Sequence, residues 1–128
     1  MIFTAKRIQL QVIRNDDDNE AAYIMLAEIA GKQKNYPEQV YYCFMAHRLN
    51  PLSRENAEKY VTSLLLARHF HRLETFLFQQ QKLSDEWQQL LLYSAGQNGN
   101  INKYKVERRP GNVLNELTFL LYKNTSLT

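Results

Sequence analysis

The sequence of 128 residues holds one cysteine, Cys43, so it can form neither an intrachain disulfide nor a CxxC motif for a metal or a redox reaction. A lone thiol suits a reducing compartment, and on that ground we expect a cytoplasmic protein. Free cysteine is usually buried as a small apolar side chain. We therefore expect Cys43 to be a packing residue rather than a reactive one.

Long apolar runs are also missing. The longest apolar stretch in a helical context, residues 64–67, is far shorter than the ~18 residues that a membrane-spanning helix needs. The opening stretch MIFTAKRIQLQVIRNDDD lacks the apolar centre and the small-residue cleavage site of a signal peptide. We therefore expect no membrane insertion and no signal peptide.

Catalytic and metal-binding motifs are absent as well. His69 and His71 are two residues apart, a spacing that does not put both on one helix face, and no cysteine or close carboxylate pair joins them. Residues 16–18 are three aspartates without the glycine and distal glutamate of a calcium loop. There is no GxSxG motif, phosphate-binding glycine loop or zinc-protease motif. We expect no metal, no cofactor and no enzymatic activity.

Neither sign of charge dominates. Sixteen Lys and Arg residues against thirteen Asp and Glu residues give a net charge of +3, which is too small to indicate nucleic acid binding. One dense basic run, KYKVERR, supplies Lys103, Lys105, Arg108 and Arg109. We interpret this run first as a solvated connector, and the alternative is a contact with an acidic partner or RNA.

What the sequence does contain is apolar residues at helical spacing. They make up 45% of the chain, which is in the range of globular proteins. Starts of helices are indicated by Asp18 or Asn19, Ser53 and Ser84 as N-caps, and GQNGN at 96–100 indicates a loop. The helical stripes occupy residues 21–30, 36–49, 57–67, 70–83 and 87–95. The sequence therefore predicts an all-α fold of short helices.

Residues 1–14 fit two patterns. Ile8, Leu10 and Val12 alternate as in a strand, whereas Ala5, Ile8 and Val12 have the spacing of a helix face. We favour the helix.

Residues 20–53 match the 34-residue tetratricopeptide pattern without a gap. The segment KQKNYPE resembles the turn between the two helices of that repeat. The matching residues are Tyr23, Leu26, Ala27 and Ala30 in the first helix, Gln39 and Cys43 in the second, and Pro51 at the end. We identify this segment as one repeat that resembles the tetratricopeptide family.

Later parts of the chain repeat the plan less closely. Residues 54–83 form a predicted second repeat that is in phase, although Gln80 and Asp85 replace the small residue and the proline. Residues 84–109 are predicted as a degenerate third repeat, and residues 112–123 as a terminal amphipathic helix. The resemblance covers about two thirds of the chain.

The resemblance implies a single domain over residues 1–128, with residues 1–18 as an N-terminal segment. Its architecture would be a right-handed superhelix of antiparallel helix hairpins, with two to three repeats and terminal helices. We expect Ala27 and Ala46 at close helix contacts and Phe44 in the core. The repeat pattern does not account for three other large side chains in this region, those of Tyr41, Tyr42 and Met45, and some of them must face outward.

Members of this family are non-enzymatic scaffolds whose first helices line a groove for a partner peptide or helix. Family members that clamp a terminal carboxylate use Lys and Asn where this chain has Ile24 and Glu28, so we do not expect it to bind chaperone tails. Mixed apolar and acidic lining favours an amphipathic, partly basic ligand. By position the groove would present Ile24, Glu28, Glu58, Thr62, Leu65, Gln88 and Leu92.

The resemblance thus implies an adaptor or a dedicated chaperone that binds another protein. The alternative is binding of an acidic partner or nucleic acid through the basic segment 103–109. Because a short repeat stack has two apolar ends, we also expect the N-terminal segment and residues 112–123 to act as caps or as a homodimer contact.

Overall fold

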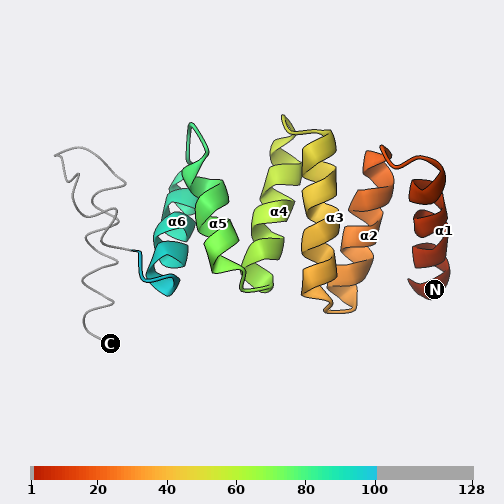
Figure 1. The fold of residues 1–128 in the computed structure, drawn as a ribbon, viewed down its shortest axis with the longest axis horizontal. Helices are drawn as coiled ribbons and strands as arrows, with labels where there is room; N and C mark the ends of the chain where they lie inside the picture. Colours follow the sequence, from red (N-terminus) through yellow and green to blue (C-terminus); the bar gives the residue numbers. More distant parts are fainter. Residues whose placement is uncertain (1, 101–128) are drawn as a thin grey trace. The chain divides into compact units, whose positions relative to one another are not determined.

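The computed structural model describes residues 2–100, and these form helices joined by short turns (Figure 1). No strand occurs within this range, which confirms the all-α prediction for it. The predicted terminal helix 112–123 and the basic run 103–109 lie outside the described residues. The helices are α1 (Ile2–Asn15), α2 (Glu20–Lys32), α3 (Tyr36–Leu49), α4 (Arg54–Leu66), α5 (Phe70–Phe78) and α6 (Asp85–Gln97).

The described residues fall into two compact units, with the boundary between Arg68 and His69. The first unit contains α1 to α4 and the second contains α5 and α6. This boundary lies inside the predicted second repeat, residues 54–83. The pairing of α4 with α5 as one hairpin therefore stays a prediction.

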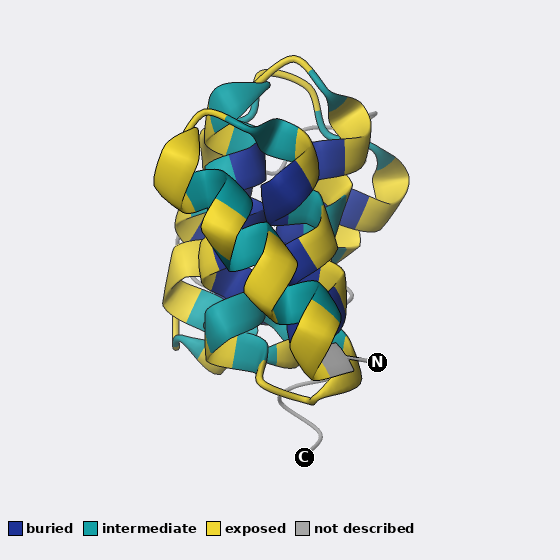
Figure 2. Ribbon diagram, turned by 90° about the vertical axis from the view of Figure 1, so that its right-hand side faces the viewer, coloured by how far each residue is buried: buried dark blue, intermediate teal, exposed yellow. Residues whose placement is uncertain are grey.

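The N-terminal segment forms the helix α1, as the helical spacing of its apolar residues predicted. It packs on α2, and no residue from Phe3 to Asn15 is fully buried (Figure 2). Among the helices of residues 2–100, none has the length and the apolar character required to cross a membrane.

The predicted N-caps are confirmed, with Asn19 rather than Asp18 at the start of α2. In each case the side-chain oxygen accepts a hydrogen bond from the backbone N–H three residues later, which satisfies a donor that has no partner within the helix. The pairs are Asn19 with Ala22 at 3.0 Å, Ser53 with Asn56 at 3.2 Å, and Ser84 with Trp87 at 3.3 Å.

Asn35 caps α3 and belongs to a polar cluster around Glu38. Its Oδ1 accepts from the Glu38 N–H at 3.4 Å, and its Nδ2 donates to Glu38 Oε2 at 2.6 Å. The other carboxylate oxygen accepts from the Tyr42 hydroxyl at 3.1 Å and pairs with Lys6 Nζ of α1 at 3.1 Å. Burial and the contact with Glu38 raise the pKa of Tyr42 to about 12. Glu38 thus links α1 to α3.

The core of the first unit lies between α2, α3 and α4. Helices α2 and α3 run in opposite directions along each other, and α4 packs on α3 (Figure 1). Ala27 and Ala46 are buried, which is consistent with close approach of the helix backbones. The largest fully buried side chains in this unit are Leu26, Val40, Val61 and Leu64.

The prediction that Phe44 lies in the core is wrong. Phe44 is 42% exposed, and Tyr42 is buried instead. Successive side chains of a helix point about 100° apart, so the buried face defined by Tyr42, Cys43 and Ala46 leaves Phe44 at its margin. There its ring still contacts the buried ring of Tyr60, with centroids 5.8 Å apart.

Asn56 joins three helices of the first unit. It is buried, and its Nδ2 donates to Glu20 Oε1 at 2.8 Å and to the Ala46 carbonyl oxygen at 3.2 Å. The same glutamate oxygen accepts from Asn50 Nδ2 at 3.4 Å. The start of α4 is thereby hydrogen-bonded to the start of α2 and the end of α3.

The second unit packs α5 on α6. Its buried glutamate, Glu74, accepts hydrogen bonds from Asn98 Nδ2 at 2.8 Å and Asn100 Nδ2 at 3.1 Å, so it holds the loop after α6. Gly99 in that loop has a φ of 74°, a conformation that glycine adopts without strain. The buried apolar side chains of the two helices are Leu73, Leu77, Trp87, Leu91, Leu92 and Ala95.

Candidate functional site

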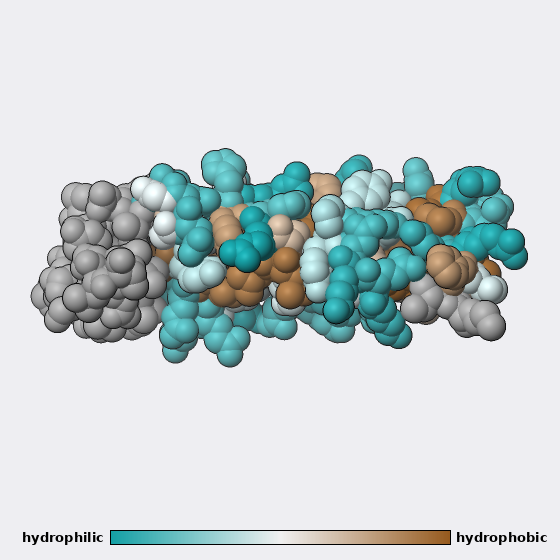
Figure 3. All heavy atoms as spheres, turned by 90° about the horizontal axis from the view of Figure 1, so that it is seen from below, coloured by the Kyte–Doolittle hydropathy of each residue, from teal (hydrophilic) through white to brown (hydrophobic). Residues whose placement is uncertain are grey.

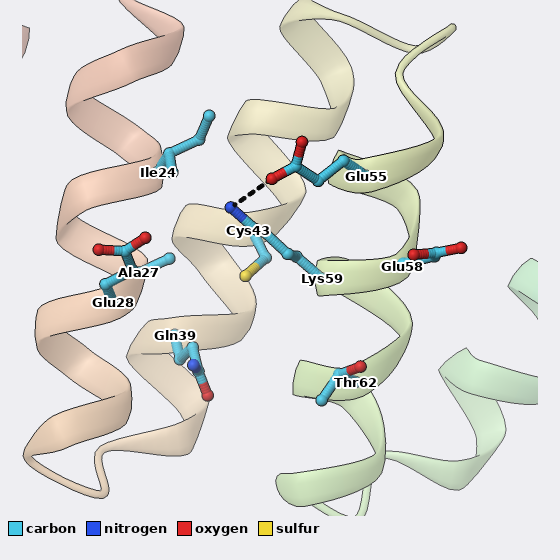
Figure 4. Close-up of a pocket in the computed structure, with 9 residues that line it drawn as sticks. All are labelled: Ile24, Ala27, Glu28, Gln39, Cys43, Glu55, Glu58, Lys59 and Thr62. Carbon is cyan, nitrogen blue, oxygen red and sulfur yellow. Dashed lines mark ion pairs between the residues drawn. The ribbon is translucent and has the colours of Figure 1, made fainter.

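A pocket of about 370 Å³ lies on the first unit, where α2, α3 and α4 all contribute side chains (Figure 4). All three contributing helices belong to the same unit, so the pocket is defined within it. The lining residues are Ile24, Ala27 and Glu28 of α2, Gln39 and Cys43 of α3, and Glu55, Glu58, Lys59 and Thr62 of α4.

Helical spacing explains why these side chains meet. Ile24 and Glu28 are four residues apart on α2, as are Glu58 and Thr62 on α4, so each pair shares a face of its helix. Helix α3 lies between α2 and α4 and forms the deeper side of the pocket (Figure 4). Ala27 of α2 is buried and small, so it leaves room for α3 to lie close to α2.

The floor of the pocket is apolar. Ala27 is 5% exposed and Cys43 is 4% exposed. Burial raises the pKa of the Cys43 thiol, although a hydrogen bond with Ser63 and the charge of Lys59 act in the opposite direction. Since the thiolate is the nucleophilic form, a raised pKa makes Cys43 a poor nucleophile. Its role here is to fill space under the pocket.

The rim of the pocket is charged. Lys59 Nζ pairs with Glu55 Oε1 at 3.3 Å, and Arg54 Nε pairs with Glu58 Oε1 at 3.1 Å, each within one turn of α4. Glu28 has no ion pair within residues 2–100. Figure 4 shows Lys59 reaching from α4 across Cys43 toward Glu55, while Glu28 stands on α2.

Gln39 is a polar residue beside the apolar floor of the pocket. Its Oε1 is buried and has no hydrogen-bond partner in the described part of the chain. Its amide nitrogen lies over Gly31, where a Cβ would come within 2.5 Å of Gln39 Nε2. The absence of a side chain at Gly31 therefore makes room for the Gln39 amide.

The structure brings together four of the residues that the repeat register placed in the groove: Ile24, Glu28, Glu58 and Thr62. Leu65 is half-buried and does not line this pocket.

Two further predicted groove residues, Gln88 and Leu92, lie on α6 in the second unit, so their place in the same groove stays a prediction. Leu92 is only 1% exposed, and Gln88 Nε2 donates to the Leu83 carbonyl oxygen at 3.2 Å. The proposed basic contact residues Lys103, Lys105, Arg108 and Arg109 lie outside the described residues.

Sequence reasoning placed Ala27 only at a helix contact, and it also missed the contributions of Gln39, Cys43, Glu55 and Lys59 to the pocket. Spacing could have indicated the last two, because Glu55 lies three residues before Glu58 and Lys59 three residues before Thr62 on the same helix. No local signal could have indicated Gln39 and Cys43, since they belong to the second helix of the predicted repeat. They line the pocket because α3 forms its deeper side.

Other surface features are less distinctive. On the face shown in Figure 3, hydrophobic side chains lie among hydrophilic ones. Phe3 and Leu52 are examples of large apolar side chains that are mostly exposed. Within residues 2–100, no group of three or more His, Cys, Asp or Glu side chains is arranged to hold a metal ion.

Comparisons with known proteins do not indicate a function, so a functional proposal rests on the pocket. No protein-family model, curated protein or solved structure matches this chain.

Proposed function

We propose that this chain is a non-enzymatic interaction module of the tetratricopeptide kind, an adaptor or dedicated chaperone that binds a peptide or helix of another protein. The observation that carries the proposal is the pocket on the first unit. Ile24, Glu28, Glu58 and Thr62, which the repeat register assigns to a ligand groove, all line it.

The order of helix contacts in the first unit supports the repeat interpretation. Each helix packs on the next one along the chain, α1 on α2, α2 on α3 and α3 on α4. Repeat proteins are built in this way, because each helix pair buries its remaining apolar face against its neighbour. The right-handed superhelix and the later repeats are part of the proposal.

The chemistry of the pocket suits binding better than catalysis. Its nucleophilic candidate is Cys43, whose raised pKa keeps the thiol protonated near neutral pH. An apolar floor under a charged rim is instead typical of sites that recognise a side chain of a partner.

Site-specific photocrosslinking tests this proposal. Thr62 is exposed on the rim, so a photoreactive phenylalanine analogue placed there should crosslink to a partner in a lysate of the native cells. The same analogue at Gln89, which is exposed on α6, is the control and should give no such product.

Binding of the captured partner should then be measured with purified proteins. Thr62→Arg, which fills the pocket mouth, should reduce affinity by about tenfold or more, whereas Gln89→Arg should leave it unchanged. A partner that binds both variants equally would show that the groove is not its site.

A further inference from the structure

We infer that the groove selects partner segments in which a lysine or arginine lies beside an apolar residue. Glu28 is the anchor for the cation, and Lys59 is a built-in competitor that the ligand displaces. This inference rests on the proposed function and specifies the chemistry of its ligand.

The first step is the charge of the lining. Three carboxylates, those of Glu28, Glu55 and Glu58, face one ammonium, that of Lys59. On α4, Glu55 and Glu58 each have a cation one turn away, with Lys59 and Arg54 respectively. Glu28 has no ion pair within residues 2–100, so it is the carboxylate best able to accept a cation from a ligand.

The second step is the size and polarity of the space. A volume of about 370 Å³ is at the lower end of the range of about 300–1,000 Å³ for ligand pockets, so it suits one or two side chains rather than a whole helix. Ile24 is half-buried beside the buried Ala27 and Cys43. Lysine and arginine match this surface, because their apolar stems can cover the floor while the charged end reaches Glu28.

The third step is the position of Lys59. Its side chain already crosses the pocket in the way expected of a bound cationic side chain, over Cys43 and toward a carboxylate (Figure 4). The pair that holds it is weak, since it joins neighbours on one helix and both side chains are more than a third exposed. A ligand side chain can therefore displace Lys59 from the pocket with little loss of stability, and its charged end can then bind Glu28.

A display library of random linear peptides, selected on the whole 128-residue chain, supplies the probe. Peptides enriched on the wild type over Thr62→Arg should carry Lys or Arg next to an apolar residue. The most enriched peptide is then synthesised together with a version in which citrulline or glutamine replaces the cation. Affinities of both are measured by fluorescence anisotropy at several salt concentrations.

The variants of the protein should shift affinity for the cationic peptide in opposite directions. Glu28→Gln should weaken binding about two- to fivefold, the size expected for losing one exposed ion pair, and Lys59→Met should strengthen it by about the same factor. Glu86→Gln, an equal change of charge at an exposed position on α6, should have no effect. The neutral peptide should not distinguish Glu28→Gln from the wild type, and salt should weaken binding of the cationic peptide only.

Failure of the inference and failure of the proposed function have different signatures. Enriched peptides without Lys or Arg, or an affinity that Glu28→Gln leaves unchanged, would overturn the choice of a cation while Thr62→Arg still blocks binding. Weaker binding by Lys59→Met would overturn the competitor role. If no peptide distinguishes the wild type from Thr62→Arg, both the inference and the proposed function are wrong.

Discussion

Buried polar residues hold the first unit in register. Asn56 is 3% exposed, and it bonds to Glu20 across 36 residues of sequence. A buried amide without partners would cost about 1–3 kcal/mol, so these hydrogen bonds favour the one arrangement of α2, α3 and α4 in which they can form. The pocket is lined by the same three helices, and its shape therefore depends on this contact.

His47 provides a prediction about pH. Its ring stacks on that of Tyr60, with centroids 6.0 Å apart and an interplanar angle of 8°. Burial lowers the pKa of His47 below its usual value of about 6.5. As the pH falls below 6.5, the unfolded chain therefore takes up a proton before the folded chain does, and the free energy of unfolding decreases.

Urea denaturation at pH 7 and pH 5 measures this effect. His47→Phe preserves an aromatic ring against Tyr60 and removes the titrating group, so the loss of stability between the two pH values should be smaller than in the wild type. Gln89→Phe, which changes a side chain that does not titrate at an exposed position, is the control and should leave the pH dependence unchanged. An equal loss in the wild type and in His47→Phe would contradict the prediction.

At the level of the helices, the ends are set by local contacts. Helix α2 ends in two bonds typical of a Schellman motif, from Asn35 N–H to the Ala30 carbonyl at 2.9 Å and from Lys34 N–H to the Gly31 carbonyl at 3.0 Å. Lys34 has a φ of 57°, in the left-handed region that disfavours residues with a side chain. This conformation begins the turn that brings α3 back along α2.

Lys34→Gly should therefore stabilise the protein by about 1 kcal/mol, because glycine adopts the left-handed conformation without the steric cost that a Cβ imposes. Denaturation in urea measures the change, and Lys32→Gly is the matched control. Lys32 is the last residue of α2 and has the ordinary helical conformation, so glycine there should not stabilise the protein. Destabilisation by Lys34→Gly would contradict this account of the helix end.

For the whole molecule, the net charge has the opposite sign to that of the pocket lining. The chain has a net charge of +3, yet the pocket lining carries more carboxylates than cations. Long-range attraction of a basic partner by the whole protein is thus not expected. Selection of a cation would depend on short-range contacts in the groove.

The division into two units predicts that residues 1–68 fold without the rest of the chain. The core of α2, α3 and α4 and the complete pocket lie in this unit. A domain of about 60 residues is small but sufficient for independent folding. The fragment should show a helical circular dichroism spectrum and a cooperative thermal transition, and it should bind the selected peptide. A spectrum typical of an unfolded chain would contradict this prediction.

The sequence by itself determined where α2, α4 and α6 begin and which residues share a helix face, whereas the stripe predicted over residues 70–83 continues past the end of α5 at Phe78. These features depend on neighbours within about four positions, as in the caps Asn19, Ser53 and Ser84. For the same reason, the pairing of Ile24 with Glu28 and of Glu58 with Thr62 could be derived from spacing. That both pairs would line one groove was implied by the resemblance to the tetratricopeptide repeat.

Only the tertiary structure decided which face of α3 is buried, and so that Tyr42 rather than Phe44 lies inside. It also decided that Lys59 crosses the pocket, that Glu28 has no ion pair within residues 2–100, and that Asn56 meets Glu20. These outcomes depend on the distance and rotation between helices. Side chains far apart in sequence fix that geometry together, so no local pattern contains it.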